Sequence, residues 1–131
     1  MILFFDRDVG TALPKALHVL QFDRHYHEVH YHQQHFPMEC LDDVWLPEAG
    51  RRGWTVIGHD SHHHTEESEL SAMKQYNIGC FYLWGAEAKR WEKMRCFARA
   101  YDRIIEAEAS TVRPFIYRVT ETGLLRPVPI P

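Results

Sequence analysis

Short apolar runs alternate along the chain with longer segments of mixed apolar and polar residues. Such runs are typical of strands that are buried on both faces, and those strands occur mainly in parallel sheets. The runs stand at residues 2–5, 54–57, 80–84 and 115–119, and a shorter one surrounds Val29. We expect each of these segments to form a strand.

Segments between these runs carry apolar residues at intervals of three and four, which is the spacing of one helix face. The first expected helix follows Thr11 and carries Leu13, Ala16, Leu17 and Leu20, and the second carries Trp45, Leu46 and Ala49. The third follows Thr65 and carries Leu70, Met73 and Tyr76. The longest runs from Glu87 to about Ala109. On this longest helix the expected apolar face consists of Trp91, Met94, Ala98, Tyr101 and Ile105. The alternation predicts a three-layer α/β/α fold with a central, mostly parallel sheet.

Composition adds limits to this picture. A chain of 131 residues with 45% hydrophobic residues is expected to form a single domain over residues 1–131. Its formal net charge of -3 gives no overall attraction to nucleic acid or anionic membranes. Cys40, Cys80 and Cys96 form no CxxC pair, which is typical of buried thiols in a reducing compartment. No apolar run approaches the length that spans a bilayer, so we expect a cytoplasmic protein without a membrane partner.

Two aspartates directly follow apolar runs. Asp6 follows the run 2–5, and Asp60 closes the segment WTVIGHD. Ligands of open α/β sheets collect at the carboxyl ends of the strands, so both carboxylates are expected in one crevice. Two ionised acids there repel each other unless a cation lies between them. Oxygen-rich sites suit Mg²⁺ or Mn²⁺, and this chemistry indicates phosphoryl transfer or hydrolysis.

Further acids stand close to these two in the sequence. Asp42 and Asp43 are expected at or before the N-cap of the Trp45 helix, with Pro47 in its first turn. The other acids that complete a ring are Asp8, Glu66, Glu67 and Glu69. Helix N-termini favour acids whatever the protein does, so capping is the preferred interpretation for Asp8, Asp43, Glu66 and Glu67. For Asp42 both interpretations stay open.

Three segments resemble the blocks of PIN-like domains, particularly of VapC-type toxin relatives. They are FFDRDVGTAL, DDVWLPEAGRRGWTVIGHD and EESELSAMKQYNIGCFYL, and the resemblance spans residues 2 to about 84. It implies a Mg²⁺- or Mn²⁺-dependent ribonuclease that hydrolyses RNA phosphodiesters with metal-activated water. It also implies RNA as substrate and, for the toxin of a toxin–antitoxin pair, an antitoxin protein as partner.

The resemblance also implies the site residues. Asp6, Asp42 and Asp60 match the family's catalytic, metal-binding acids. Many family members have a further acid shortly after the third one, whereas this chain has Ser61 and three histidines. Glu69 is our candidate for the fourth metal ligand, with Glu66 or Glu67 behind it.

Two alternatives stay open beside this hypothesis. The missing fourth acid is compatible with a catalytically inactive PIN-like module that binds RNA or protein. A receiver-like signalling domain also has an acid pair after its first strand and an aspartate after its third. The final strand segment PFIYR, however, contains no lysine where receiver domains need one.

Histidines and basic residues form two further patterns. The five histidines His25, His27, His30, His32 and His35 have a spacing that on a strand alternates between its faces, but solvated side chains are the preferred interpretation over a metal site. Arg95, Arg99 and Arg103 form a stripe on the longest helix, which nearby acids are expected to neutralise. We expect Trp84 and Trp91 in the core or at a partner interface, and the longest helix to mediate a homodimer.

Overall fold

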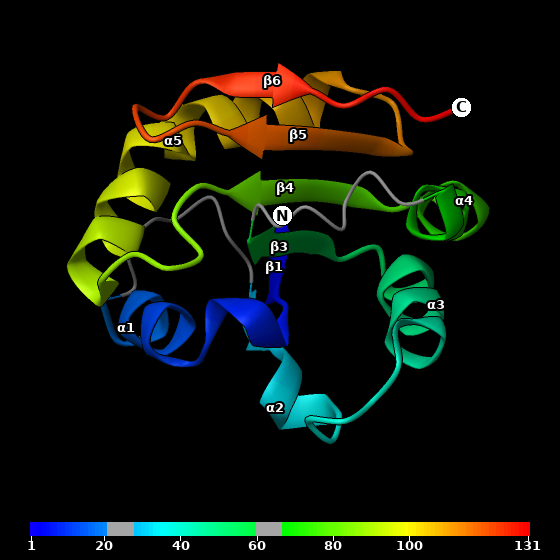
Figure 1. Cartoon of the computed structure of the whole chain (residues 1–131), viewed down its shortest axis with the longest axis horizontal. Helices are drawn as coiled ribbons and strands as arrows, with labels where there is room; N and C mark the ends of the chain where they lie inside the picture. The colour runs from blue at the N-terminus through cyan, green and yellow to red at the C-terminus, as the bar shows by residue number, and fades with distance from the viewer. Residues whose placement is uncertain (21–27, 60–66) are drawn as a thin grey trace.

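Six strands form one sheet in the order β2-β1-β3-β4-β5-β6 (Figure 1). This computed structural model describes residues 1–20, 28–59 and 67–131. The strands are β1 (Ile2–Phe5), β2 (Glu28–Tyr31), β3 (Thr55–His59), β4 (Gly79–Leu83), β5 (Phe115–Val119) and β6 (Leu125–Pro127). All neighbouring strands pair in parallel except β5 and β6, which are antiparallel. The expected α/β fold with a mostly parallel sheet is therefore confirmed.

Helices cover both faces of the sheet. They are α1 (Ala12–Leu20), α2 (His32–His35), α3 (Asp42–Arg52), α4 (Glu67–Gln75) and α5 (Arg90–Ser110), and a 3-10 helix, η1 (Arg7–Val9), follows β1. α1 and α5 supply buried residues to one core cluster, while α3 and α4 supply the other. Figure 1 shows the two pairs on opposite sides of the molecule. Each expected strand and helix is present within the described residues, and Thr65, the expected cap before α4, lies outside them.

Alternation along the strands divides the core into these two halves. On β1, Leu3 and Phe5 join the cluster of α1 and α5, whereas Phe4 between them joins the cluster of α3 and α4. Phe4 is stacked on Trp54, with ring centroids 4.8 Å apart and an interplanar angle of 11°. A run that is apolar at every position is therefore required, because successive side chains enter different layers.

The face that the longest helix turns to the core only partly matches the expected one, of which Met94 and Tyr101 pack against the core. Trp91, on the expected apolar face, is 70% exposed, and Ala98 is exposed as well. The buried positions centre on Phe97, Ala100 and Ile104. The expected stripe was wrong by about one residue of rotation, because Phe97 and Ala100 extend the same three-four spacing along the adjacent edge of the helix.

Local details around α2 and α3 also differ from the expectation. α3 begins at Asp42, so Asp42 and Asp43 lie within its first turn rather than at or before its N-cap. Pro47 consequently lies in the second turn, where its missing N–H leaves the carbonyl of Asp43 without its usual intrahelical donor. At His32 the chain leaves β2 and turns into α2, which the histidine pattern did not predict.

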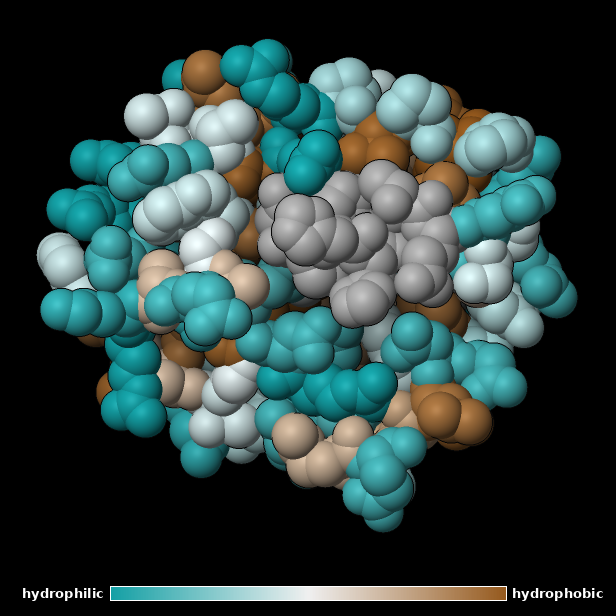
Figure 2. All heavy atoms as spheres, in the orientation of Figure 1, coloured by the Kyte–Doolittle hydropathy of each residue, from teal (hydrophilic) through white to brown (hydrophobic). Residues whose placement is uncertain are grey.

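Three further features concern the cysteines, the polar character of the surface and the apolar character of the helices. Cys40, Cys80 and Cys96 are free and buried, as expected. Polar side chains cover most of the face seen in Figure 2, with smaller hydrophobic patches between them. Within the described ranges, no helix combines the length and the apolar character needed to cross a membrane.

Gly50 lets α3 approach the end of α4 closely. A Cβ at this position would lie 2.3 Å from the carbonyl oxygen of Tyr76, a backbone atom that cannot move aside cheaply. Helix propensity alone favours alanine over glycine by about 1 kcal/mol in a helix interior. Steric overlap with backbone costs about 1–3 kcal/mol or more and opposes that gain.

We therefore expect Gly50→Ala to lower the free energy of unfolding, measured by urea denaturation. Arg51→Ala, at the exposed neighbouring position, is the matched control and is expected to change it by about 0.5 kcal/mol or less. A Gly50→Ala variant more stable than the wild type would contradict the close approach of the two helices.

Candidate metal centre

A cavity of about 590 Å³ opens at the carboxyl ends of β1 and β3. Its polar lining residues include Asp6, Arg7, Asp8, Asp42, Asp43, Ser68, Glu69, Ser71, Gln75, Tyr76 and Tyr82. β1 pairs with β2 on one side and with β3 on the other, so the connection after β1 leads to one side of it and the connection after β2 leads back to the other side. Ligands of open parallel sheets bind at such a switch point.

Asp6 lies at the base of this cavity, directly after β1. Its backbone N–H donates to the carbonyl of Ile57 on β3 over 2.9 Å, which fixes the main chain at the switch point. Its Oδ1 accepts a 2.6 Å hydrogen bond from the backbone N–H of Arg7 and so caps η1. The side chain is 17% exposed. Burial, and then the charges of Asp8 and Asp42, raise the pKa of Asp6 to about 7.

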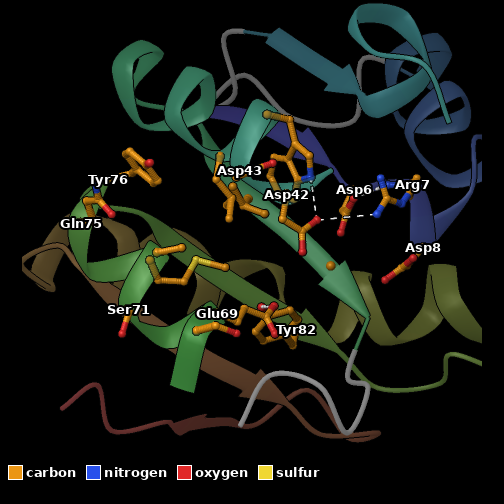
Figure 3. A pocket seen from close by; sticks show the side chains of 17 residues that line it. Asp6, Arg7, Asp8, Asp42, Asp43, Glu69, Ser71, Gln75, Tyr76 and Tyr82 are labelled. Carbon is orange, nitrogen blue, oxygen red and sulfur yellow. Dashed lines mark hydrogen bonds and ion pairs between the residues drawn. The ribbon is translucent and has the colours of Figure 1, made fainter. Parts of the chain in front are cut away.

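Asp42 faces Asp6 from the start of α3 (Figure 3). Its Oδ1 accepts a 3.0 Å hydrogen bond from Trp45 Nε1 and lies 3.6 Å from Arg7 Nη2. Arg7 also donates to the carbonyl of Cys40, which ties the guanidinium to the segment before α3. Both contacts fall on one carboxylate oxygen, Oδ1. With 55% of its side chain exposed, Asp42 forms the accessible wall of the site.

Glu69 lines the opposite wall of the cavity. It projects from α4 and accepts a 2.7 Å hydrogen bond from the hydroxyl of Tyr82 on β4. Burial, followed by nearby Cys80 and Glu69, raises the pKa of Tyr82, so the phenol keeps its proton and remains a donor. Figure 3 shows this pair apart from the group formed by Asp6, Arg7 and Asp42.

Three acids for which capping was the preferred interpretation lie in the first turns of helices. Asp8 lies in the first turn of η1, Asp43 in that of α3, and Glu67 in that of α4. Asp60 and Glu66 lie outside the described residues. Within the described ranges, no group of three His, Cys, Asp or Glu side chains is close enough to hold a metal ion.

Sequence patterns missed two residues that line this cavity, Arg7 and Tyr82, and one buried residue beside Asp6, His32. Arg7 was overlooked between two acids, although an arginine there can offset their repulsion. Tyr82 was assigned to a buried strand, and its hydroxyl reaches Glu69. His32, expected to be solvated, is fully buried, and its Nδ1 lies 4.0 Å from Asp6 Oδ1.

Several residues of the histidine and arginine patterns contact neighbouring side chains or carbonyls. His30 Nδ1 lies 2.9 Å from His35 Nε2, and His30 Nε2 lies 2.5 Å from a carboxylate oxygen of Glu28. In the arginine stripe, Arg99 and Arg103 donate to carbonyls of the β5–β6 turn, and the expected neutralisation by acids stays a prediction. His25 and His27 lie outside the described residues.

Comparisons with known proteins place this cavity in context. A family model described as a PIN like domain matches residues 1–85, which include β1 to β4 and every described acid of the cavity. The chain belongs to the PIN-like domain family. Searches of curated proteins and of solved structures found no match.

PIN-like domains are commonly nucleases, generally depend on divalent metal ions, and often bind RNA. The residues of this cavity fit such an ion in two respects. Carboxylate oxygens are the ligands that Mg²⁺ and Mn²⁺ prefer. A cation also offsets the repulsion among Asp6, Asp8 and Asp42, which adds to the effect of burial in raising the pKa of Asp6.

The raised pKa of Asp6 has a consequence for metal-free stability. An unfolded chain ionises Asp6 near pH 3.8, whereas the folded chain holds its proton up to about pH 7. The folded state therefore binds more protons between these values, and its stability falls as pH rises through that window, by about 1.4 kcal/mol per unit of pKa difference at most.

We expect Asp6→Asn to remove this loss. In EDTA at pH 8 the variant should be more stable than the wild type by about 1–3 kcal/mol, and the difference should vanish near pH 4. Urea denaturation at both pH values measures it, with Asp43→Asn at an exposed position of the same cavity as control. A variant less stable than the wild type at pH 8 would contradict a costly buried carboxylate.

Proposed function

We propose that this chain is a metal-dependent endoribonuclease of the PIN-like class that hydrolyses RNA phosphodiesters. The observation that carries the proposal is the carboxylate of Asp6 at the switch point of the sheet, where burial, and then the charges of Asp8 and Asp42, raise its pKa to about 7. Evolution retains such an arrangement at functional sites more often than elsewhere, since it costs stability.

Asp6, Asp42 and Asp60 are the residues that we propose to hold a Mg²⁺ or Mn²⁺ ion. When bound, such an ion supplies Lewis acidity, which lowers the pKa of water and offsets charge on a phosphodiester. Asp6 is rigid, because its main chain is bonded to β3 and its Oδ1 to Arg7. Trp45 and Arg7 orient the carboxylate of Asp42 through its Oδ1.

Charge in the cavity supports the dependence on cations. Five carboxylates line it, from Asp6, Asp8, Asp42, Asp43 and Glu69, and among the described lining residues Arg7 is the basic side chain that faces them. A phosphate backbone is repelled from such a surface. Bound cations reverse the local charge, so RNA and metal are expected to bind together.

The size of the cavity agrees with a nucleotide of single-stranded RNA. At about 590 Å³ it falls within the range of small-molecule sites. Tyr76 and Gln75 at the end of α4 line its rim and supply an aromatic ring and an amide that can contact a base (Figure 3).

The proposal has three further parts. They are a role as the toxin of a toxin–antitoxin pair with an antitoxin partner, a single domain over residues 1–131, and a homodimer.

One observation favours a second candidate function, a PIN-like module without catalytic activity that binds RNA or protein. Within the described ranges, no three potential ligands converge on one point. Cleavage and metal binding must therefore be measured separately.

We expect the full chain to cleave a 5′-labelled single-stranded RNA in Mn²⁺, and to lose this activity in EDTA. Asp6→Asn should lower the rate by about 100-fold or more, because it removes the buried charge that attracts the cation. Asp43→Asn, which removes an exposed acid from the same cavity, should retain most of the activity.

Each other outcome of this assay has a distinct meaning. Equal activity of Asp6→Asn and wild type would remove Asp6 from the site. Bound Mn²⁺ without cleavage of any RNA would favour the non-catalytic module. Phosphorylation of Asp60 by a small phosphodonor would instead support a receiver-like domain.

Glu69 and Asp6 are expected to contribute unequally to metal binding. Tyr82 holds Glu69 on the far wall, so we propose that Glu69 contacts the ion through water. Glu69→Gln should weaken Mn²⁺ binding by about 10-fold, and Asp6→Asn by about 100-fold or more, in titration calorimetry. Asp43→Asn, at an exposed position of the same cavity, is the control. Equal losses for Glu69→Gln and Asp6→Asn would make Glu69 a direct ligand.

A further inference from the structure

His32 is a buried imidazole beside the proposed metal site. Its side chain is 0% exposed, and its ring packs against Phe36 at 5.5 Å and against Trp45 at 6.3 Å between centroids. Histidines are seldom buried so completely without a polar reason, because each ring carries two nitrogen atoms that need partners.

One of the two nitrogen atoms has such a partner. Nε2 lies 2.9 Å from the carbonyl oxygen of Pro37. A carbonyl only accepts hydrogen bonds, so Nε2 carries a proton and donates it. The neutral ring therefore has its lone pair on Nδ1.

The other nitrogen atom faces the carboxylate of Asp6. Nδ1 lies 4.0 Å from Asp6 Oδ1, and it has no hydrogen-bond partner among the described residues. A lone pair and a carboxylate oxygen that face each other in a buried place require a proton or a cation between them. Packing against Phe36 and Trp45 explains the ring, but it does not explain why this nitrogen is directed at Asp6.

The distance allows both atoms to bind one ion. Metal–oxygen and metal–nitrogen bonds of about 2.1 Å let two ligand atoms of one ion lie up to about 4.2 Å apart. The 4.0 Å between Nδ1 and Oδ1 falls within this limit. Metal-binding histidines also donate their second ring N–H to a carbonyl or carboxylate, which fixes the tautomer, and Pro37 supplies that acceptor here.

We propose that His32 Nδ1 is a nitrogen ligand of the divalent cation held by Asp6, so that the site prefers Mn²⁺ over Mg²⁺. The inference rests on the metal site of the proposed function and goes beyond its all-carboxylate ligand set. Mg²⁺ demands oxygen ligands, whereas first-row transition metals also accept imidazole.

The exposed histidine cluster serves as an internal comparison. His30 uses one ring nitrogen toward His35 and the other toward Glu28, so its nitrogen atoms are occupied by neighbours. His35 lies on the same short helix as His32 and is exposed. His35→Phe is therefore a matched control that removes an imidazole without touching Asp6.

The test is pulsed electron paramagnetic resonance of the full chain with bound Mn²⁺. In the wild type we expect the ¹⁴N coupling of a directly bound imidazole, which should change to ¹⁵N coupling when histidine is ¹⁵N-labelled. The nitrogen coupling should be lost in His32→Phe and retained in His35→Phe. Mn²⁺ affinity should fall by about 10-fold or more in His32→Phe, with a smaller change for Mg²⁺. His32→Gln provides a second variant if the phenylalanine disturbs folding.

Two outcomes would overturn the inference. One is a wild-type protein that binds Mn²⁺ in an Asp6-dependent way without nitrogen coupling, and this result needs no His32 variant. The other is a coupling that persists in a folded His32 variant. Nitrogen coupling without RNA cleavage would overturn the proposed ribonuclease function and leave His32 as a metal ligand. Cleavage without nitrogen coupling would overturn His32 as a ligand and leave the proposed function in place.

Discussion

The pairing of β1 with a parallel strand on each side determines where the rest of the candidate site lies. It buries Leu3, Phe4 and Phe5 completely and leaves Asp6 at the first position where the chain leaves the sheet. The hydrogen bond from Asp6 N–H to Ile57 then holds this residue at the seam between β1 and β3. A carboxylate placed there by backbone pairing cannot move to solvent without breaking the central strand.

This constraint explains why the acids of the cavity differ in electrostatic behaviour. Asp42 stands on a helix terminus, where Arg7 and Trp45 offset its charge and more than half of its side chain is exposed. Asp6 is buried, and its hydrogen-bond donor is one backbone N–H, so the charge of Arg7 does not compensate for burial and for the charges of Asp8 and Asp42. The folded chain therefore stores an unfavourable charge at one point, and a bound cation would release that cost.

Sequence patterns predicted the elements better than their details. Continuous apolar runs found the strands, because burial in two layers requires an apolar residue at every position. The face of α5 was misjudged because aromatic Trp91 fits the helical spacing as well as Phe97 does, and only tertiary packing selects between them. Asp6 was found from its place after a strand. The burial of His32 was not predicted, because it depends on the direct change from β2 to α2 at this residue.

His32 also bears on how this site could do without an acid after Asp60. In a site of carboxylates alone, each added charge raises the affinity for a cation but also adds repulsion in the metal-free state. The charges of Asp8 and Asp42 already add to the effect of burial on the pKa of Asp6. A neutral imidazole contributes a ligand without that repulsion. Its position is fixed by the carbonyl of Pro37 and by packing in the core, so it lies in place before the cation arrives. A buried nitrogen ligand is thus a physically cheaper addition to this cavity than another carboxylate.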